Sequence, residues 1–185
     1  MKRLLNYTII ISLSLVVFGC GGPTIDMNSD EGYYIEITKN KIATYKGVLF
    51  SGTIVVYYKN GQLGNKGTYK DGEEDGDFEG YYENGQLNFK RPYKDGKGEG
   101  DFEEYFENGQ LSSKTTYKDG KGEDGPWESY YENGQLKLKE TYKDGELDGT
   151  WEEYYENGQL REKRTYKDGK QEGDTEYYDE NGQPE

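Results

Sequence analysis

Residues 149–168 read GTWEEYYENGQLREKRTYKD, and near-copies of this stretch fill the chain from Gly52 to residue 185. Two turn-forming patterns recur in steps of 24 residues, one step being 25: Asn-Gly, starting at Asn60, Asn84, Asn108, Asn133, Asn157 and Asn181, and Tyr-Lys-Asp-Gly, starting at Tyr69, Tyr93, Tyr117, Tyr142 and Tyr166. A fixed period of roughly 20–50 residues indicates a repeat architecture, in which each repeat is one supersecondary unit.

The Asn-Gly pair predicts the tight turn of a hairpin in each repeat. Both residues tolerate the positive φ that a two-residue type I′ turn requires, and strand-like residues flank the pair. Asp-Gly marks the opposite end of each unit, where we expect a looser turn. The 25-residue step adds its residue between Gly120 and Gly125, so we expect an insertion in a loop that leaves the strand register intact.

Centring the turn on Asn157-Gly158 fixes which residues lie opposite each other in that hairpin. The predicted pairs are Tyr155 with Leu160, Tyr154 with Arg161, Glu152 with Lys163, and Trp151 with Arg164. The charge pair recurs in the other repeats, as Glu79 with Lys90, Glu103 with Lys114, and Glu128 with Lys139. Opposite charges across a hairpin contribute about 0.2–1 kcal/mol each, and here they mainly penalise a slip in register.

Alternation along the strands divides each hairpin into two faces. One, the core face, carries Trp151, Tyr155, Leu160 and Tyr166 in this repeat, with aromatic residues and leucines at the same places in the others. The opposite face is polar except for one tyrosine per repeat. These tyrosines, which we call the tyrosine row, are Tyr81, Tyr105, Tyr130 and Tyr154.

The composition favours one layer of sheet over two packed layers. Hydrophobic residues make up 31% of the chain and charged residues 32%, so aliphatic side chains are too few for a sandwich core, whereas the 20 tyrosines recur in phase with the turns. The predicted fold is therefore all-β, an elongated single-layer antiparallel β-meander built from ~24-residue hairpin repeats. The stability of such a stack is roughly a sum of neighbour terms.

The N-terminal residues resemble a bacterial lipoprotein signal. Lys2 and Arg3 precede an apolar run at residues 9–18, which is too short to span a bilayer. The run ends in Val-Phe-Gly-Cys, which is similar to a lipobox, and this predicts a signal peptide at residues 1–19 and lipid attachment at Cys20. An ordinary secretory signal with a chance cysteine is the alternative. Gly21 follows the cysteine, and the resemblance to Gram-negative lipoproteins then favours the outer membrane.

Three segments follow the predicted signal. Residues 20–32 are rich in Gly, Pro, Asp, Asn and Ser and predict a lipidated tether. Residues 33–51 are more aliphatic and predict N-terminal capping strands, because terminal units of repeat proteins are atypical. Residues 52–185 are the hairpin repeat array, with five full repeats and a partial one in which Tyr177-Tyr178 lies one place further from the turn.

The repeat pattern YYENGQLxxKxTYKDGxxxG resembles the MORN-variant repeats of the bacterial YwqK family, whose members often carry the label antitoxin. Residues 46–63, KGVLFSGTIVVYYKNGQL, look like the opening repeat of such proteins. The resemblance implies an elongated antiparallel β-meander and brings no active-site motif with it. A lipid anchor agrees poorly with neutralising a cytoplasmic toxin, and leaves a target in the envelope as the alternative.

The residue types present argue against catalysis. The chain has no histidine and one cysteine, which removes His-based triads, cysteine nucleophiles and the usual zinc ligands. Acidic residues recur from repeat to repeat, whereas an active site is one unique constellation. We therefore expect no enzyme activity, no cofactor and no metal site. The acidic, glycine-rich turns at residues 71–77, 95–101 and 119–124 leave calcium as an alternative, without the spacing of an EF-hand loop.

The tyrosine row is the candidate partner-binding site, because tyrosines among small polar neighbours suit contacts with proteins or sugars. The alternative is that tyrosine simply forms strands well and packs its ring along the sheet. We expect a non-enzymatic cell-envelope lipoprotein that presents a rigid repeat surface to another protein or envelope component. The alternative is an antitoxin or immunity-type protein that neutralises a toxin by direct binding. The net charge of −14 argues against nucleic acid and fits a basic partner.

Overall fold

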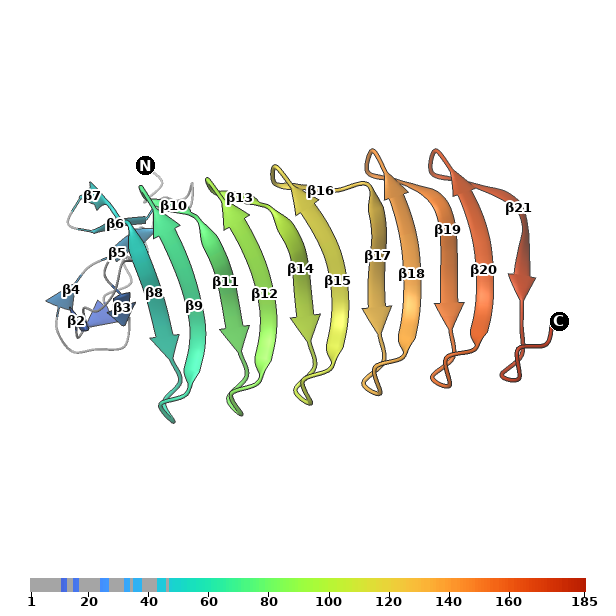
Figure 1. Cartoon of the computed structure of the whole chain (residues 1–185), viewed down its shortest axis with the longest axis horizontal. Coiled ribbons are helices and arrows are strands. Elements are labelled where there is room, and N and C mark those ends of the chain that lie inside the picture. Colours follow the sequence, from blue (N-terminus) through green and yellow to red (C-terminus); the bar gives the residue numbers. More distant parts are fainter. Residues whose placement is uncertain are drawn as a thin grey trace, which may run out of the picture. The chain divides into compact units, whose positions relative to one another are not determined.

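The computed structural model describes residues 11–12, 15–16, 24–26, 32–33, 35–37, 43–45 and 47–185. All regular structure in these ranges is β-strand, so the prediction of an all-β meander of hairpins is confirmed (Figure 1). None of the described segments forms a helix that could cross a bilayer. The chain divides into two compact units, Met1–Gly85 with Tyr93–Gly96, and residues 86–92 with 97–185.

The first unit contains three groups of paired strands. β1 (Ile11–Ser12) pairs with β4 (Gly32–Tyr33), and β5 (Ile35–Ile37), β6 (Ala43–Tyr45) and β7 (Val48–Leu49) form a small antiparallel sheet. The main sheet has the order β2 (Leu15–Val16), β3 (Thr24–Asp26), β8 (Gly52–Tyr57), β9 (Leu63–Lys70) and β11 (Gly76–Tyr81), with β10 (Glu73–Glu74) paired to β9.

One pairing in this unit is parallel, between a strand that precedes the predicted repeat array and the first strand of that array. β3 runs parallel to β8, with Thr24 opposite Thr53 and Ile25 opposite Ile54. Parallel neighbours need a connection of about a dozen residues or more, and the chain between β3 and β8 has that length. A non-repeated strand therefore covers the N-terminal edge of the first repeat.

The fully buried hydrophobic core of the described residues lies in this unit. Its main cluster contains Ile25, Ala43, Phe50, Ile54 and Tyr69. Aromatic rings extend it: Tyr69 packs 5.3 Å from Phe78, and Phe78 packs 5.3 Å from Tyr93, both edge to face. Such pairs contribute about 0.5–1.5 kcal/mol beyond the area that they bury.

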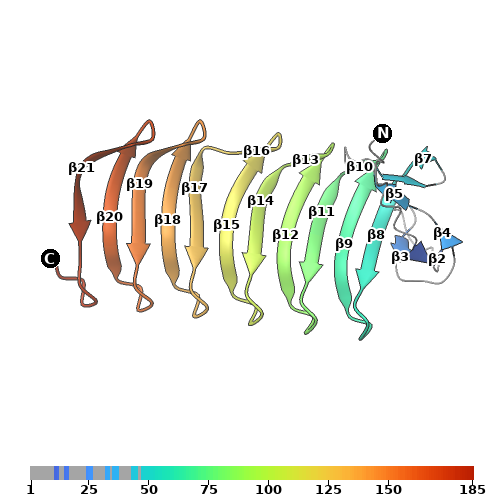
Figure 2. The same cartoon turned by 180° about the vertical axis from the view of Figure 1, so that it is seen from behind.

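The second unit is a meander of antiparallel hairpins (Figures 1 and 2). Its strands are β12 (Leu87–Lys94, whose last two residues belong to the first unit), β13 (Lys97–Gly98), β14 (Gly100–Tyr105), β15 (Leu111–Lys118), β16 (Lys121–Gly122), β17 (Gly125–Tyr130), β18 (Leu136–Lys143), β19 (Glu146–Tyr154), β20 (Leu160–Lys167) and β21 (Lys170–Tyr177). No hydrophobic side chain of residues 86–92 and 97–185 is fully buried. The core face here is a half-buried layer, in which Phe102 lies 4.2 Å from Tyr117.

The two turns of each repeat are the reverse of the prediction. Asp168 has φ 46° and Gly169 φ 74°, and Lys167 lies opposite Lys170, so Asp-Gly forms the two-residue type I′ turn. At the other end only Gly158 has positive φ, 83°, and its N–H donates to the Tyr155 carbonyl at 2.9 Å. Asn-Gly therefore closes a three-residue loop, a type I turn followed by glycine in a G1 bulge.

The longer loop changes the register beside the turn. Tyr154 lies opposite Leu160 rather than Arg161, and Arg161 is an extra residue that restores the predicted pairs Glu152–Lys163 and Trp151–Arg164. Because a shift of one residue moves a side chain to the other face, Leu160 lies on the same face as the tyrosine row and not on the core face as predicted. The same change holds where Leu111 lies opposite Tyr105 and Leu136 opposite Tyr130.

The 25-residue repeat takes its extra residue in a loop, as predicted. Two residues, Glu123 and Asp124, separate β16 from β17, where one residue separates β13 from β14. Beyond this loop Lys114 lies opposite Glu128, the same register that places Lys139 opposite Glu152 in the next repeat.

Candidate binding surfaces

The polar face of the second unit carries a line of alternating charges that crosses eight strands. The register places its members opposite one another in the order Lys90, Glu103, Lys114, Glu128, Lys139, Glu152, Lys163 and Glu176, which we call the charge ladder. Lys–Glu pairs thus occur not only within each hairpin, as predicted, but also between neighbouring hairpins. Lys139 Nζ lies 3.1 Å from Glu128, and Lys114 Nζ lies 3.8 Å from Glu103.

The tyrosine row is bound to the acidic residues of this face. Each phenol of the row donates a hydrogen bond to the glutamate two residues before it, at 2.7 Å for Tyr81, 2.8 Å for Tyr105 and Tyr130, and 2.9 Å for Tyr154. Tyr81 lies in the first unit and the other three in the second. The structure therefore gives all four predicted residues the same local environment, and their rings are half-buried.

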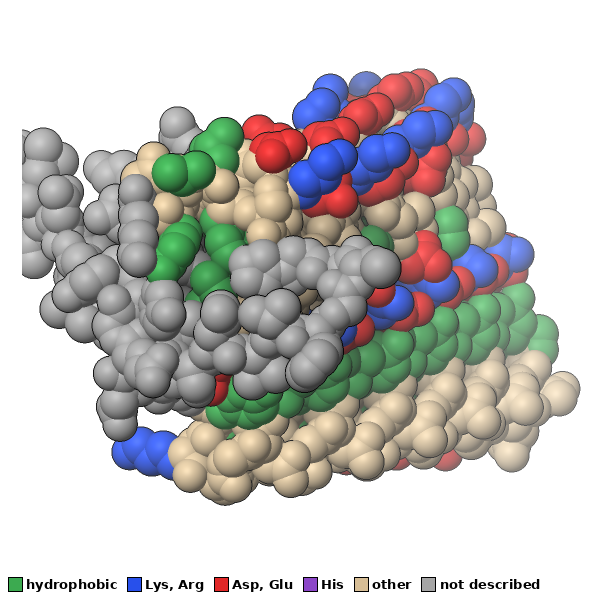
Figure 3. Space-filling model, turned by 60° about the vertical axis from the view of Figure 1, so that its left-hand side comes forward, with side chains coloured by type: hydrophobic (Ala, Val, Ile, Leu, Met, Phe, Trp, Pro, Cys, Tyr) green, Lys and Arg blue, Asp and Glu red, His purple; other side chains and the backbone are tan. Residues whose placement is uncertain are grey.

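Tyrosines of the row share their band with leucines. Tyr105, Tyr130 and Tyr154 lie opposite Leu111, Leu136 and Leu160, so tyrosine and leucine alternate on successive strands. We call these six residues the Tyr–Leu band. Figure 3 shows a hydrophobic band next to a band in which acidic and basic side chains alternate, as this register requires. An apolar band bordered by charges is a surface of the kind that proteins use for binding.

Burial keeps the phenols of the row protonated. Desolvation, and then the hydrogen bond to the neighbouring glutamate, raises the pKa of Tyr81, Tyr105, Tyr130 and Tyr154 from 10.0 to about 12. At neutral pH each hydroxyl donates a hydrogen bond to a carboxylate, so its oxygen remains available to a partner only as an acceptor. The row can thus offer ring surface and hydrogen-bond acceptors to a partner.

The second tyrosine of the Tyr-Tyr pair connects repeats. Tyr131 donates its hydroxyl to the carbonyl of Tyr154 at 2.7 Å, and Tyr155 does the same to the carbonyl of Tyr178 at 3.0 Å. Asn133 adds a parallel contact, from its side-chain nitrogen to the carbonyl of Glu156 at 2.8 Å. The backbone carbonyls of Tyr154 and Tyr178 are therefore each held by a tyrosine of the repeat before.

The partial repeat contributes a residue that the sequence reasoning missed. Tyr178 donates to Glu176 at 2.6 Å, as Tyr154 does to Glu152, and so continues the tyrosine row. Asp179 takes the place that Tyr155 has at the turn, and its Oδ1 accepts from the backbone N–H of Gln183 at 2.8 Å. The aromatic pair shifted one place from the turn was the signal that could have identified Tyr178.

The acidic turns have a structural role that bears on the calcium alternative. Asp124 accepts the backbone N–H of Asp144 at 2.7 Å, and Glu99 accepts that of Asp119 at 3.0 Å. Each acid thus caps the Asp-Gly turn of the following repeat. In the part of the chain that the structure describes, no group of three or more His, Cys, Asp or Glu side chains is placed to hold a metal ion.

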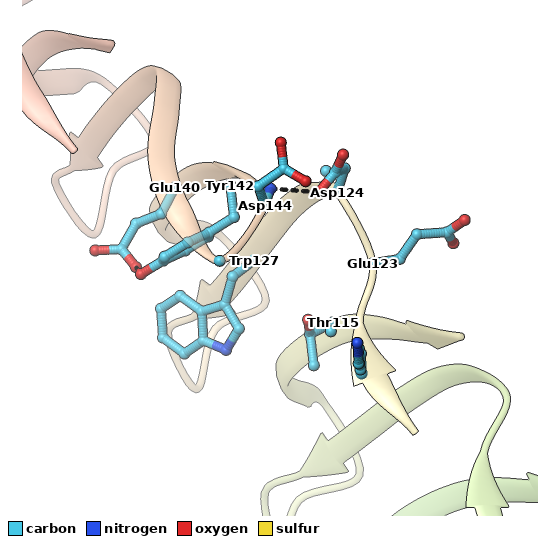
Figure 4. A pocket seen from close by; sticks show the side chains of 11 residues that line it. Thr115, Glu123, Asp124, Trp127, Glu140, Tyr142 and Asp144 are labelled. Carbon is cyan, nitrogen blue, oxygen red and sulfur yellow. Dashed lines mark hydrogen bonds between the residues drawn. The ribbon is translucent and has the colours of Figure 1, made fainter. Parts of the chain in front are cut away.

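The opposite face of the second unit has a hollow of about 640 Å³ that sequence reasoning also missed. It lies beside the inserted loop, and its lining includes Trp127, Glu140, Tyr142, Thr115 and Asp124. Figure 4 shows the rings of Trp127 and Tyr142 near each other, with Glu123 and Asp124 on the loop and Thr115 on another strand. The 25-residue step was the sequence signal for this irregularity.

The chain is thus a β-hairpin repeat protein. Its hairpins recur, side-chain contacts join one turn to the next, and the same surface returns with each repeat. The chain belongs to the MORN repeat variant family, whose model matches residues 51–71, 74–95, 98–119, 123–144, 147–168 and 171–185. None of the curated proteins gives a significant match to the chain. The predicted lipid-attachment residue, Cys20, lies outside the described residues.

Proposed function

We propose that this chain is a non-enzymatic binding protein of the bacterial cell envelope, which presents its repeat surface to another protein or envelope component. Membership of the MORN repeat variant family supports the binding role, since MORN repeats are often protein- or membrane-binding modules. In this proposal residues 1–19 are a signal peptide, and a lipid on Cys20 holds the protein to a membrane, with the outer membrane favoured in a Gram-negative cell.

The observation that carries the proposal is the Tyr–Leu band beside the charge ladder. In the second unit the same groups return every second strand, at a spacing of about 10 Å given the ~4.8 Å between strands. A partner with a matching spacing could contact several repeats at once. Binding would then gain strength from effective concentration along the surface rather than from one deep pocket.

The absence of a catalytic step in this proposal rests on repetition. Glu103, Glu128 and Glu152 each accept from the following tyrosine and lie between two lysines. An active site is one constellation with its own perturbed environment, whereas these carboxylates have the same partners in each repeat. Their arrangement suits a surface.

Crosslinking from the tyrosine row in intact cells tests the binding role. A photoreactive amino acid at Tyr130 is expected to give one discrete crosslinked species that mass spectrometry identifies, and the same amino acid at the exposed Lys143 serves as control. In a second variant, Tyr81, Tyr105, Tyr130 and Tyr154 are replaced with serine and the photoreactive amino acid is placed beside the row. Capture of the partner should then be abolished. Full retention of partner binding by a folded serine variant would exclude the row as the binding site.

Membrane attachment has its own test. The Cys20→Ser variant should leave the membrane fraction and lose incorporation of radiolabelled palmitate, while circular dichroism of the repeat array stays unchanged. Membrane association that survives this substitution would reject the lipid anchor and leave the binding role standing.

The hypothesis that the protein is an antitoxin is retained as a second candidate function because of the net charge of −14. An acidic protein that neutralises a basic toxin should bind tightly, one to one, with an affinity that falls steeply as salt rises. The repeat-surface reading predicts weaker contacts whose strength rises with the number of repeats. Calorimetry of the captured partner at two salt concentrations, with the full array and an array shortened by one repeat, separates the two.

A further inference from the structure

The hollow beside Trp127 arises where the inserted loop interrupts the repeat. In the preceding repeat the ring of Phe102 covers Gly98, since a Cβ on that glycine would lie 2.8 Å from Phe102 Cζ. Gly122 is the equivalent residue, opposite Tyr117, but a Cβ there would meet nothing within 4 Å. The extra residue in the loop thus leaves open a space that an aromatic ring fills one repeat earlier.

The next repeat shows what the equivalent tryptophan contacts when its surroundings are regular. Arg164 lies opposite Trp151, and its guanidinium carbon is 4.6 Å from the centre of a Trp151 ring. The same guanidinium is paired with Glu162, its Nε donating at 2.6 Å. The Trp151 indole N–H donates to Glu140 at 2.9 Å. A tryptophan at this place in the repeat is therefore covered by an arginine that a carboxylate orients.

Trp127 has the carboxylate without the arginine. Its opposite residue on β18 is Glu140, where Trp151 has Arg164. The short Thr115 of β15 lines the hollow together with Trp127. Within residues 47–185, all of which are described, no cation lies over the Trp127 ring and no acceptor meets its indole N–H. The ring remains half-buried and borders the hollow.

The charges around the hollow are complementary to a cation. Its lining includes four acidic residues, Glu123, Asp124, Glu140 and Asp144, and one basic residue, Lys121. Glu140 accepts from Tyr142 at 2.8 Å and from Trp151 at 2.9 Å. A carboxylate has about four acceptor sites, so Glu140 can accept from a further donor.

We propose that this hollow receives an arginine side chain of a protein partner, with the guanidinium stacked on Trp127 and paired with the carboxylates that line the hollow. The partner arginine would take the position over Trp127 that Arg164 has over Trp151. Arginine fits better than lysine because its planar, weakly hydrated guanidinium stacks on an aromatic face and donates in a fork to a carboxylate. The inference rests on the proposed function in taking the partner to be a protein.

Two-dimensional ¹H–¹⁵N NMR of the full repeat protein tests this directly, because its two tryptophans give two indole signals. Trp127→Phe and Trp151→Phe assign them. Titration with the peptide acetyl-Gly-Arg-Gly-amide should move the Trp127 indole signal saturably and leave the Trp151 signal in place. The matched citrulline peptide, which keeps the shape and loses the charge, should bind about tenfold more weakly, as expected for loss of a desolvated cation–π contact.

A space-filling variant provides the second arm. Leu147 lies opposite Tyr142 as Gly122 lies opposite Tyr117, so Gly122→Leu copies a side chain that the fold already holds at this place. This variant should remain folded and lose the shift with the arginine peptide. Retained binding by the folded Gly122→Leu protein would overturn the proposal.

The remaining outcomes also decide. A Trp127 signal that does not move, or moves equally with citrulline, would reject an arginine site, and a shift caused only by a neutral oligosaccharide would assign the hollow to sugars. Peptide binding with no partner captured from the tyrosine row would reject the proposed function alone. Capture of a partner with no peptide binding would reject this inference alone.

Discussion

Asn133 donates a hydrogen bond from its side-chain nitrogen to the backbone carbonyl of Glu156, 2.8 Å away and 23 residues further along the chain. The same side chain accepts the backbone N–H of Gln135 through Oδ1 at 2.9 Å. One asparagine therefore closes its own turn and joins that turn to the next. The contact recurs at Asn60, Asn108 and Asn157 with the turn that follows each of them.

Replacing Asn133 with alanine should lower the free energy of unfolding by about 1–3 kcal/mol, because two hydrogen bonds of about 0.5–1.5 kcal/mol each are lost. Urea denaturation followed by circular dichroism measures the change. Asn181→Ala is the matched control, since the side-chain nitrogen of Asn181 contacts Asp179 of its own turn at 3.3 Å and no later repeat. Equal losses in the two variants would contradict a role in joining repeats.

Removing one whole period should leave a folded protein. Deletion of residues 149–172 joins Asp148 to Gly173, so the glycine that begins the partial repeat takes the place of Gly149. Repeat stability is roughly a sum of neighbour terms, so the denaturation midpoint should fall modestly and the circular dichroism spectrum should keep its shape. Global unfolding of the shortened chain would show that the repeats do not contribute additively.

Alkaline pH should weaken the fold through the tyrosine row. The pKa of Tyr154 is raised from 10.0 to about 12 in the folded state, first by burial and then by the hydrogen bond to Glu152. A raised folded pKa means that the contribution to stability is complete below pH 10 and is lost as the pH passes 12. The free energy of unfolding should therefore fall over this range, while absorbance at 295 nm reports tyrosines that ionise late.

Tyr154→Phe is the control for that titration. It keeps the ring in the Tyr–Leu band and removes the ionising hydroxyl, so the variant should lose less stability than the parent protein between pH 10 and 12. A decline of the same size in both proteins would assign the alkaline sensitivity to other groups.

Reversing one charge of the charge ladder should be costly for a surface residue. Lys139 lies between Glu128 and Glu152, so Lys139→Glu places three carboxylates side by side. We expect a loss of about 1 kcal/mol at low salt that shrinks as the ionic strength rises, because like charges opposite each other are destabilising and salt screens them. Lys139→Met, which removes the charge and keeps the length, should lose less and depend little on salt.

Much of the fold could be predicted from the repeat, because period, alternation and charge pairing all depend on local sequence. Two pairs predicted in this way are present in the structure, Glu152 opposite Lys163 and Trp151 opposite Arg164. The turn types could not be predicted in this way, because tolerance of positive φ is only one property of asparagine and its side chain also forms hydrogen bonds. Asn157 instead uses its side chain to bond Glu180 in the next turn, which single-repeat reasoning does not reveal.

The binding surfaces were predictable in part. The tyrosine row follows from alternation, but Leu160 was assigned to the wrong face because one extra loop residue changes the local register. The hollow at Trp127 depends on three separate features, the inserted residue, the missing side chain of Gly122 and the short Thr115. Each is unremarkable in the sequence, and only their meeting in space creates the site.

The asparagine contacts also have a consequence for the chemical lifetime of the protein. Asn-Gly is prone to deamidation, which requires the glycine nitrogen to attack the preceding side-chain amide, and asparagine is among the thermolabile residues. At Asn157 the side-chain nitrogen donates to Glu180 of the next turn, and Oδ1 accepts the backbone N–H of Gln159. Succinimide formation at such a turn must wait for local unfolding, whereas Asn181, held only within its own turn, is the position where ageing of the folded protein should begin.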